Sequence, residues 1–254
     1  MSILEVENLT KSFGSNRAVD NVSLRIEEGE FVSFVGSNGA GKTSFCNLVT
    51  ALLMADSGSI AFNGRDITRS SIVERIRLGI ARSFQLVNLF DDMDSSENVA
   101  LAILARQGKT RRIATFASRD SAVRDEADAI LKQFGLSGRN FAIVRDLSQG
   151  ERKLLDVAVA FALRPKLLFL DEPTSGVGTR DKIQIMETVD GAVRQSGTTV
   201  VIVEHDMDVV FKYSDRVVAM HQGAVVAQGT PDEIKSNQLV ASMLFGTATF
   251  PKGH

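Results

Sequence analysis

The sequence predicts an α/β fold, a mixed β-sheet core that carries a helical insertion. A continuous apolar run at residues 31–35 leads into a glycine-rich loop and then an apolar-periodic helix over 42–53. Two further apolar runs, 166–170 and 198–203, have the composition of buried parallel strands, each followed by polar residues. Between these parts, over about 91–163, the apolar spacing is helical.

Composition and charge are those of a globular protein. The chain has 254 residues, 44% of them hydrophobic and 24% charged, with a formal net charge of −2. This balance excludes a disordered chain and a strongly basic nucleic-acid-binding protein, so we expect no nucleic-acid partner. Cys46 is the only cysteine, so no disulfide can form within the chain, and a reducing compartment is expected. No apolar run is long enough to span a bilayer and no secretory signal is evident, so any membrane role is expected to be peripheral.

The N-terminal part of the chain predicts an antiparallel β-subdomain followed by a buried strand. Residues 3–9 and 19–26 alternate apolar and polar side chains, which is typical of half-exposed strands. Residues 31–35 are almost entirely apolar, which indicates a strand buried on both faces. A short strand over 59–62 is expected after the helix.

The insertion predicts two helices with clear end signals. Asp94 and Glu97 have the spacing of a capping box, which predicts a helix over 96–105. A second helix, near 119–134, is expected to stop at Gly135, because glycine is common after the last helical residue.

The C-terminal part predicts a helix from about Asp206, then a hairpin of 216–220 and 223–228. Thr230 and Glu233 form a further capping box, with proline at the first helical position.

Neither an internal repeat nor a linker divides the chain, which predicts a single domain over 1–254. Its nucleotide-binding core is expected at about 1–90 and 162–245, its helical subdomain at about 91–161, and an untethered tail at 246–254.

The glycine-rich loop fits the P-loop pattern and lies between a buried strand and a helix. Glycines let successive N–H groups surround phosphate oxygens, Lys42 reaches the terminal phosphates, and the Thr43 hydroxyl ligates Mg²⁺. A glycine turn without a ligand is the alternative, but the strand-to-helix position favours a nucleotide. The predicted nucleotide-binding residues here are Gly36, Ser37, Asn38, Gly39, Ala40, Gly41, Lys42, Thr43 and Ser44.

Two carboxylates follow the buried strand at 166–170. Asp171 is suited to hold the Mg²⁺ shell, and Glu172 to polarise the water that attacks the terminal phosphate. A solvated carboxylate at a strand end is the alternative for Glu172, which a P-loop in the same chain disfavours.

The segment Leu147-Ser148-Gln149-Gly150-Glu151 predicts a helix start. Ser148 and Glu151 have capping-box spacing for a helix through Leu163. Such an N-terminus is also an anion site that could meet a phosphate from another subunit.

The order of P-loop, Gln85, LSQGE and LLFLDEP resembles that of the ATP-binding-cassette (ABC) ATPases over nearly the whole chain. The resemblance implies a P-loop NTPase core of the ABC ATPase type with a helical subdomain, and ATP and Mg²⁺ as cofactors. It also implies that two ATPase subunits hold two ATP molecules head to tail. The signature residues that would contact the partner's nucleotide are Ser148, Gln149, Gly150 and Glu151.

The same resemblance gives roles to three further residues. Gln85 would contact Mg²⁺, His205 would be a switch residue at the terminal phosphate, and Phe13 would stack on adenine. From the residues alone, the alternatives are a surface glutamine, a locally hydrogen-bonded histidine and a core phenylalanine. The predicted catalytic residues are Lys42, Glu172 and His205, and the predicted metal ligands are Thr43, Gln85 and Asp171.

Some positions depart from the family pattern. Gly178 stands where the family usually has an acidic residue or asparagine in the loop between the two sites. Gln149 replaces a glycine, Glu151 a common glutamine, and Val159 a frequent arginine. These departures favour an altered partner site rather than an altered local one.

Residues 80–90, 97–99, 203–207 and 228–231 resemble the ATPases of branched-chain amino acid-type importers. This resemblance implies two membrane-spanning channel subunits, two ATPase subunits that are identical or different, and an external solute-binding protein. The chain would then lie peripherally at the cytoplasmic face of the inner (plasma) membrane. Leu86, Leu89 and Phe90 would meet a helix of a channel subunit.

The basic residues of 106–124 predict a solvated face or a contact with anionic headgroups or the channel subunit. Two alternatives to a hydrolysing importer subunit remain. One is a soluble single-cassette scaffold, and the other is a weakly hydrolysing partner in an asymmetric ATPase pair, which Gly178 and Gln149 favour.

Overall fold

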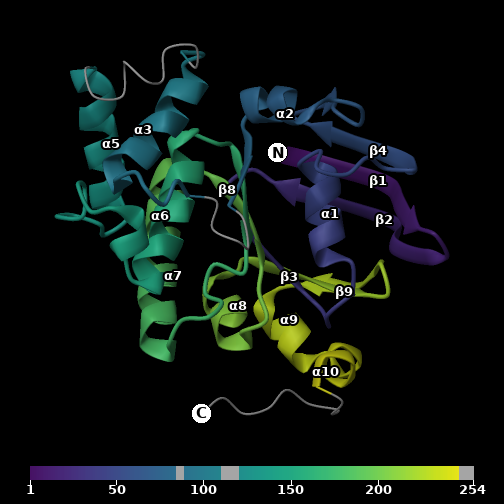
Figure 1. Ribbon diagram of the computed structural model, residues 1–254. Coiled ribbons are helices and arrows are strands. Elements are labelled where there is room, and N and C mark those ends of the chain that lie inside the picture. Colours follow the sequence, from purple (N-terminus) through teal and green to yellow (C-terminus); the bar gives the residue numbers. More distant parts are fainter. Residues whose placement is uncertain (84–88, 110–119, 246–254) are drawn as a thin grey trace. The chain divides into compact units, whose positions relative to one another are not determined.

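The computed structural model describes residues 1–83, 89–109 and 120–245 (Figure 1). Backbone contacts divide the chain into two compact units. Unit 1 is built from Met1–Arg75 and the part of the chain from Thr198 onward, and unit 2 is Ile76–Gly197. The single domain with a core at 1–90 and 162–245 stays a prediction, and the predicted tail at 246–254 lies outside the described residues.

Unit 1 contains an antiparallel sheet in the order β2-β1-β4-β5. Its strands are β1 (Ser2–Phe13), β2 (Asn16–Glu27), β4 (Ser57–Phe62) and β5 (Arg65–Asp66). Buried and exposed side chains alternate along most of β2, as expected for a sheet with one solvated face. The two N-terminal strands and the strand at 59–62 are confirmed.

A second sheet in unit 1 has the strand order β10-β9-β3-β8. The strand β3 (Phe31–Val35) pairs in parallel with β8 (Thr199–Val203) and with β9 (Arg216–His221), and β10 (Ala224–Gly229) completes an antiparallel hairpin with β9. Every residue of β3 and β8 is buried, which explains why both segments are apolar. The predicted buried strands and hairpin are confirmed.

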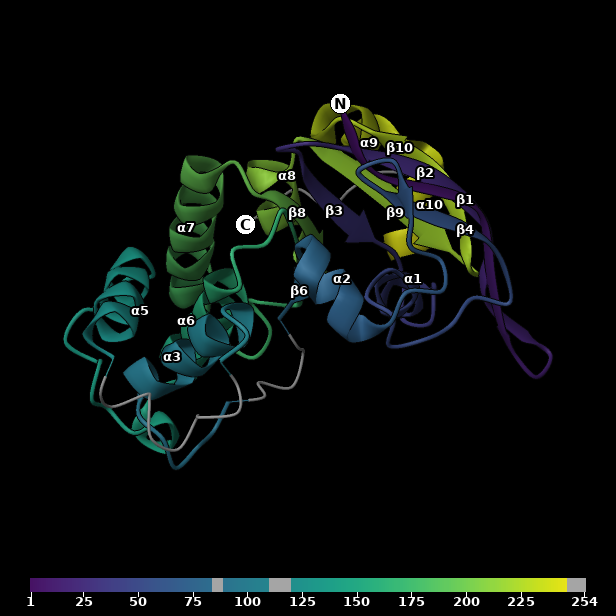
Figure 2. The same cartoon turned by 90° about the horizontal axis from the view of Figure 1, so that it is seen from above.

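Three helices near the C-terminus complete unit 1. They are α8 (Met207–Tyr213), α9 (Pro231–Ser236) and α10 (Gln238–Phe245). Val210, Ile234 and Val240 pack with Val35, Val217 and Ala219 in one buried cluster, so the helices cover β3 and β9 (Figures 1 and 2). The capping box at the start of α9 is confirmed, whereas α10 was not expected.

The helix after the glycine loop is shorter than predicted. It is α1 (Lys42–Val49), because Thr50 is its C-cap and the next residue, Ala51, has φ of 62°. A left-handed residue cannot continue a right-handed helix, so the predicted end at 53 is wrong.

A buried arginine holds the end of α1. Arg75, on α2 (Ile72–Leu78), is 1% exposed. Its guanidinium donates hydrogen bonds to the carbonyls of Leu48 (2.6 Å), Val49 (2.7 Å), Ile67 (2.7 Å), Thr68 (3.1 Å) and Ser70 (3.3 Å). Burial lowers the pKa of Arg75 to about 10. Arg75 therefore satisfies carbonyl groups that α1 leaves without an intrahelical donor.

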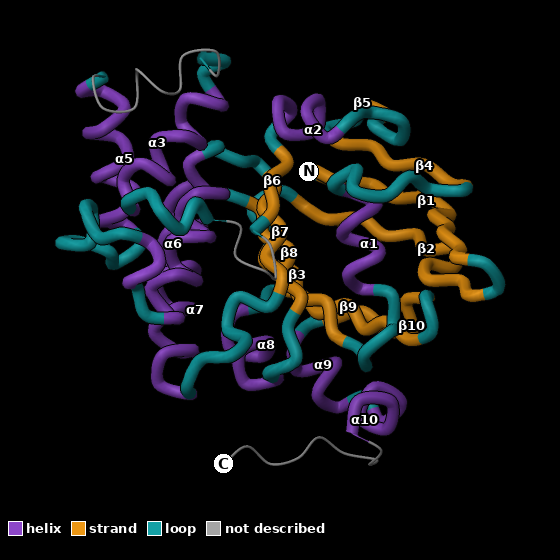
Figure 3. Tube along the Cα trace, in the orientation of Figure 1, coloured by secondary structure: helices purple, strands orange, loops and turns teal. Residues whose placement is uncertain are grey.

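Unit 2 is mainly helical (Figure 3). Its helices are α3 (Ser95–Arg106), α5 (Ser121–Gln133), α6 (Gln149–Ala162) and α7 (Thr179–Ser196), with a 3₁₀ turn at Val144–Asp146. The strands β6 (Ile80–Arg82) and β7 (Leu167–Asp171) pair in parallel. None of the helices in the described part of the chain is both long and apolar enough to cross a membrane.

Of the helices in unit 2, α3 and α6 begin at the predicted capping boxes, whereas no cap was predicted for α5. Asp94 and Glu97 form the capping box of α3, and the Asp120 side chain caps α5. The predicted start of α5 at 119 is therefore two residues too early. The helix α7 was not predicted, although its buried residues have helical spacing: Ile185, Met186, Val189, Ala192 and Val193.

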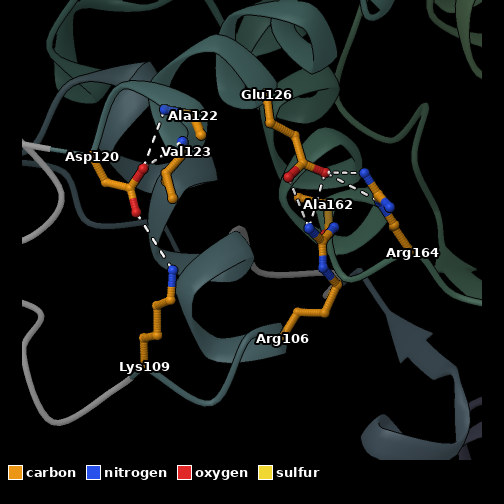
Figure 4. Close-up of polar contacts among 8 residues, drawn as sticks. All are labelled: Arg106, Lys109, Asp120, Ala122, Val123, Glu126, Ala162 and Arg164. Carbon is orange, nitrogen blue, oxygen red and sulfur yellow. Dashed lines mark hydrogen bonds and ion pairs between the residues drawn. The ribbon is translucent and has the colours of Figure 1, made fainter.

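Some basic residues of 106–124 form ion pairs and hydrogen bonds within unit 2. Arg106 donates to both carboxylate oxygens of Glu126 (3.0 and 2.8 Å) and to the carbonyl of Ala162 (2.8 Å), and Arg164 binds the same carboxylate (Figure 4). These bonds, that of Arg106 foremost, lower the pKa of Glu126. Lys109 lies 3.5 Å from Asp120. The expectation of a solvated or membrane-facing run is thus wrong for Arg106, and Arg111, Arg112 and Arg119 lie outside the described residues.

Candidate functional site

The P-loop connects β3 to α1, as the sequence predicts. Two of its glycines lie where a side chain would not fit. A Cβ on Gly41, whose φ is 103°, would collide with the carbonyl oxygen of Ala18, and one on Gly36 would collide with that of Met220. The Gly223 N–H donates to the carbonyl of Ala40 at 3.0 Å. The loop is therefore held by β2 and by the β9–β10 hairpin.

The inside of the loop is cationic. Lys42 is 5% exposed, and its ammonium donates to the carbonyls of Gly36 (2.6 Å) and Ser37 (3.1 Å). Gly41 is the N-cap of α1 and provides no side-chain cap. The first N–H groups of α1 thus favour an anion beside Lys42, as phosphate binding requires.

Most of the remaining P-loop residues are accessible to a ligand. Thr43 is exposed and Ser44 is half-buried. The residues Ser37, Asn38 and Gly39 are exposed, and Ala40 is buried.

His205 and Phe13 also belong to unit 1. His205 is exposed just after β8, and its main-chain N–H donates to the carboxylate of buried Glu204 at 3.1 Å. Phe13 ends β1 with 50% of its surface exposed, and the Lys11 ammonium lies 5.7 Å from its ring centre. This exposure contradicts a core role for Phe13. Gln85 lies outside the described residues.

Asp171 ends β7 in unit 2 and is 3% exposed. Its Oδ2 accepts a hydrogen bond from Arg82 Nη2 at 2.6 Å. Its Oδ1 is buried and has no hydrogen-bond partner among the residues that the structure describes. A carboxylate oxygen left in this way fits a Mg²⁺ ion or a water of its shell, because Mg²⁺ prefers oxygen ligands and keeps several waters.

Glu172 is half-buried and has a left-handed backbone, with φ of 48°. This conformation is unfavourable for a residue other than glycine, and such residues cluster at functional sites. The strained position is therefore consistent with the role predicted for Glu172.

The signature segment begins α6 with a capping box, as predicted. Ser148 Oγ accepts from the N–H of Glu151 (3.3 Å), and the Glu151 carboxylate accepts from the N–H of Ser148 (2.8 Å) and from Arg139 (2.7 Å). Burial raises the pKa of Glu151, but the bonds from Ser148 and Arg139 outweigh burial and hold it below its usual value. Glu151 is therefore a charged carboxylate at neutral pH.

The signature segment borders a hollow of about 270 Å³ in unit 2, which the loop after Glu172 and the start of α7 complete. Its lining includes Ser148, Gln149, Gly150, Gly176, Gly178 and Asp181. Gln149 and Gly176 fit each other closely, because a Cβ on Gly176 would collide with the amide nitrogen of Gln149. Gly178 is the N-cap of α7 and provides no side-chain cap.

Gly176→Ala is expected to lower the free energy of unfolding by about 1–3 kcal/mol. The added methyl collides with Gln149, and φ of 77° is unfavourable for alanine. The Gln149 amide is the end of an exposed, flexible side chain that can turn away, so most of the loss comes from the backbone at Gly176. Gln149→Ala should therefore restore less than about 0.5 kcal/mol, in urea unfolding of the single and double variants.

The matched control is Gly191→Ala in the exposed part of α7, where no atom lies within 4 Å of the added carbon. This change should stabilise the chain by about 0.5–1 kcal/mol, since alanine favours helices over glycine. A larger recovery in the double variant would show that the Gln149 side chain cannot move away from Gly176.

Comparison with known proteins agrees with this arrangement. A family model described as ABC transporter matches residues 19–175. The probable branched-chain amino acid transport ATP-binding protein LivG of Archaeoglobus fulgidus is 34% identical over 251 residues, which cover 97% of this chain and 96% of that protein. The chain belongs to the ABC transporter family. It is an ABC ATPase, the ATP-binding subunit of an ABC transporter.

Other relatives and solved structures support this membership. The high-affinity LivG protein of Salmonella typhimurium is 33% identical, over 97% of this ABC ATPase and 98% of that protein. The ADP conformation of the ATP-binding cassette MJ1267 matches with a TM-score of 0.87 and 29% identity, over 97% and 99% of the two chains. The dimeric, post-hydrolysis cassette MJ0796 with bound ADP and Pi matches with a TM-score of 0.77 and 27% identity, over 90% and 98%. The predicted ABC ATPase fold is confirmed.

Two residues of this ABC ATPase near the predicted site were missed. Arg82 pairs with Asp171, and Lys153 lies under the loop that follows Glu172. The sequence gives no sign that a basic residue at the end of a short strand or within a helix binds such a partner, because the partner is distant in the sequence. The position of Arg82 just before Ser-Phe-Gln was the only available hint.

Proposed function

We propose that the chain is the ATP-hydrolysing subunit of a branched-chain amino acid-type importer. The observation that carries this proposal is an intact P-loop, in which the Lys42 ammonium donates to the carbonyls of Gly36 and Ser37. The chain that contains this loop is similar to LivG proteins over nearly its full length. The BraF protein of Pseudomonas aeruginosa, whose name also specifies branched-chain amino acid transport, is 33% identical over 97% of the chain. ATP would close a pair of ATPase subunits, and hydrolysis would reopen them.

Each predicted site residue has a role in this proposal. The P-loop N–H groups and Lys42 bind the phosphates, and Phe13 stacks on the base. Glu172 accepts the proton of the attacking water, and His205 contacts the terminal phosphate. Thr43, Asp171 and Gln85 would hold Mg²⁺, which neutralises charge on the phosphates when bound.

The partners follow from the same proposal. The signature residues Ser148, Gln149, Gly150 and Glu151 meet the nucleotide of a second ATPase subunit, identical or different. Two channel subunits span the membrane, an external protein delivers the solute, and this chain lies peripherally at the cytoplasmic face. The dimeric form of MJ0796 and the membership of cbiO1 in the cbiONQ transporter complex support such an assembly.

The decisive experiment is affinity purification of the tagged chain from detergent-solubilised native membranes, followed by mass spectrometry. The proposal expects multi-spanning proteins to co-purify. A second, different ABC ATPase among them would establish a heteromeric pair. Soluble partners alone would contradict the importer and favour a cytosolic scaffold.

Replacing Leu89 and Phe90 by serine is expected to lower transport at least about tenfold while ATP binding is unchanged. Phe90 is 59% exposed and Leu89 half-buried, so their loss should remove contact with a channel subunit without disturbing the core. Transport is measured as solute uptake into proteoliposomes, and ATP affinity by equilibrium binding. Phe141→Ser, which removes a phenylalanine that is also exposed (77%), is the control. Normal uptake in the Leu89 and Phe90 variant would contradict the proposed contact, and Leu86, the third residue expected there, lies outside the described residues.

A weakly hydrolysing member of an asymmetric pair is the second candidate. Gly178 favours it, because this N-cap of α7 has no side chain to reach another subunit. The kcat of Glu172→Gln distinguishes the two candidates.

A further inference from the structure

Lys153 of α6 places a buried ammonium group under the loop that follows β7. Lys153 is 6% exposed. Its Nζ donates to the carbonyl oxygen of Glu172 at 3.2 Å and to the hydroxyl of Ser175 at 3.1 Å. A buried ammonium is costly unless it is hydrogen-bonded, so these contacts fix the position of the loop relative to α6.

Lys153 binds the main chain of Glu172, the residue whose backbone is strained. Glu172 has φ of 48°, and its carbonyl is the group that Lys153 binds. Holding this carbonyl fixes the peptide plane that follows the Cα atom. The direction of the Glu172 side chain is thereby restricted as well, since both depend on the same left-handed backbone.

A second contact connects the same helix face to the same loop. Gln149 and Lys153 are four residues apart on α6, so they lie on one face of the helix. Gln149 lies against Gly176, and Lys153 binds Glu172 and Ser175. Two residues of the signature helix thus contact this loop, Lys153 at Glu172 and Ser175 and Gln149 beside Gly176.

We propose that Lys153 is a positioning residue for ATP hydrolysis, which couples the signature helix to the main chain of Glu172. The inference rests on the proposed role of Glu172 as proton acceptor. When the start of α6 binds the partner's nucleotide, Lys153 transmits that position to the catalytic carboxylate of its own chain. This connection between two sites uses no side chain at Gly178.

The test measures kcat and KM for ATP in the assembled transporter. Lys153→Met keeps an unbranched side chain one atom shorter but removes its donor, and should lower kcat at least about tenfold while KM and the ATP dissociation constant stay within about twofold. Lys153→Arg, which keeps a cationic donor, should recover at least about a third of the lost kcat. The control is Arg152→Met on the same helix, where the guanidinium binds Asp91 and the carbonyl of Val144 rather than Glu172.

A role through Glu172 also makes the effects non-additive. In the Glu172→Gln background, Lys153→Met should cause no further loss, because the group that it positions is already gone. An additional loss there, or a kcat for Lys153→Met equal to that of Arg152→Met, would overturn the inference.

Two further outcomes separate the inference from the proposed function. Inactive Glu172→Gln with fully active Lys153→Met overturns the inference alone, whereas active Glu172→Gln overturns the role of Glu172 and the inference together. If Lys153→Met does not assemble, Lys153→Gln, which keeps a shorter neutral donor, replaces it under the same criteria.

Discussion

Glu172→Gln is expected to lower the kcat of ATP hydrolysis by the assembled transporter at least about 100-fold while ATP still binds. The amide has the shape of the carboxylate but cannot accept a proton from the attacking water. The left-handed backbone at 172 and the bond from Lys153 to its carbonyl are retained, since neither uses the carboxylate. Phosphate release gives kcat, and equilibrium binding gives the affinity for ATP.

The control for this substitution is Glu187→Gln, which neutralises an exposed carboxylate on α7 and should leave kcat within about twofold. If Glu172→Gln retains most of the turnover of the complex, the catalytic role is contradicted. Hydrolysis would then take place mainly at the other site of an asymmetric pair.

Arg75→Met is expected to lower the free energy of unfolding by at least about 3 kcal/mol. Five carbonyl groups lose the bond from Arg75, and those of Leu48 and Val49 are at the end of the helix that begins at the P-loop. The carbonyls of Leu48 and Ile67 keep a bond from a main-chain N–H. Each buried carbonyl left unpaired costs about 1–3 kcal/mol, and entry of water should recover part of that cost. The change corresponds to a Tm lower by roughly 6–12 °C, measured by calorimetry.

Arg77→Met is the matched control, because Arg77 is an exposed arginine two residues further along α2. Its effect should stay within about 0.5 kcal/mol. A similar loss in both variants would show that the carbonyl contacts of Arg75 contribute little.

Much of the fold follows from local patterns in the sequence. The three capping boxes and the alternating strands β1 and β2 are determined by residues close together in the chain, so their positions were predicted within a few residues. The P-loop was predictable for the same reason, since its glycines, Lys42 and Thr43 act through the adjacent backbone.

The contacts between distant segments could not be predicted in this way. Arg75 binds carbonyls 26 and 27 positions away, and Lys153 binds a carbonyl 19 positions away. A buried basic side chain has the same letter in the sequence as a solvated one, and only the packing of other elements distinguishes them. The helix α7 is a different case, because the spacing of its buried apolar residues is local information that does predict a helix.

The Glu151 side chain both caps the start of α6 and places a negative charge there. Glutamine can also accept the bond from the N–H of Ser148 in a capping box, so Glu151→Gln would keep the start of α6 while removing one negative charge. Arg139 already offsets that charge in the present sequence. Position 151 can therefore change the electrostatic potential at the start of α6, at the cost of the ion pair with Arg139 and of the stabilisation that the lowered pKa of Glu151 reflects. The change in potential should be largest at low salt concentration, because dissolved ions screen an exposed charge.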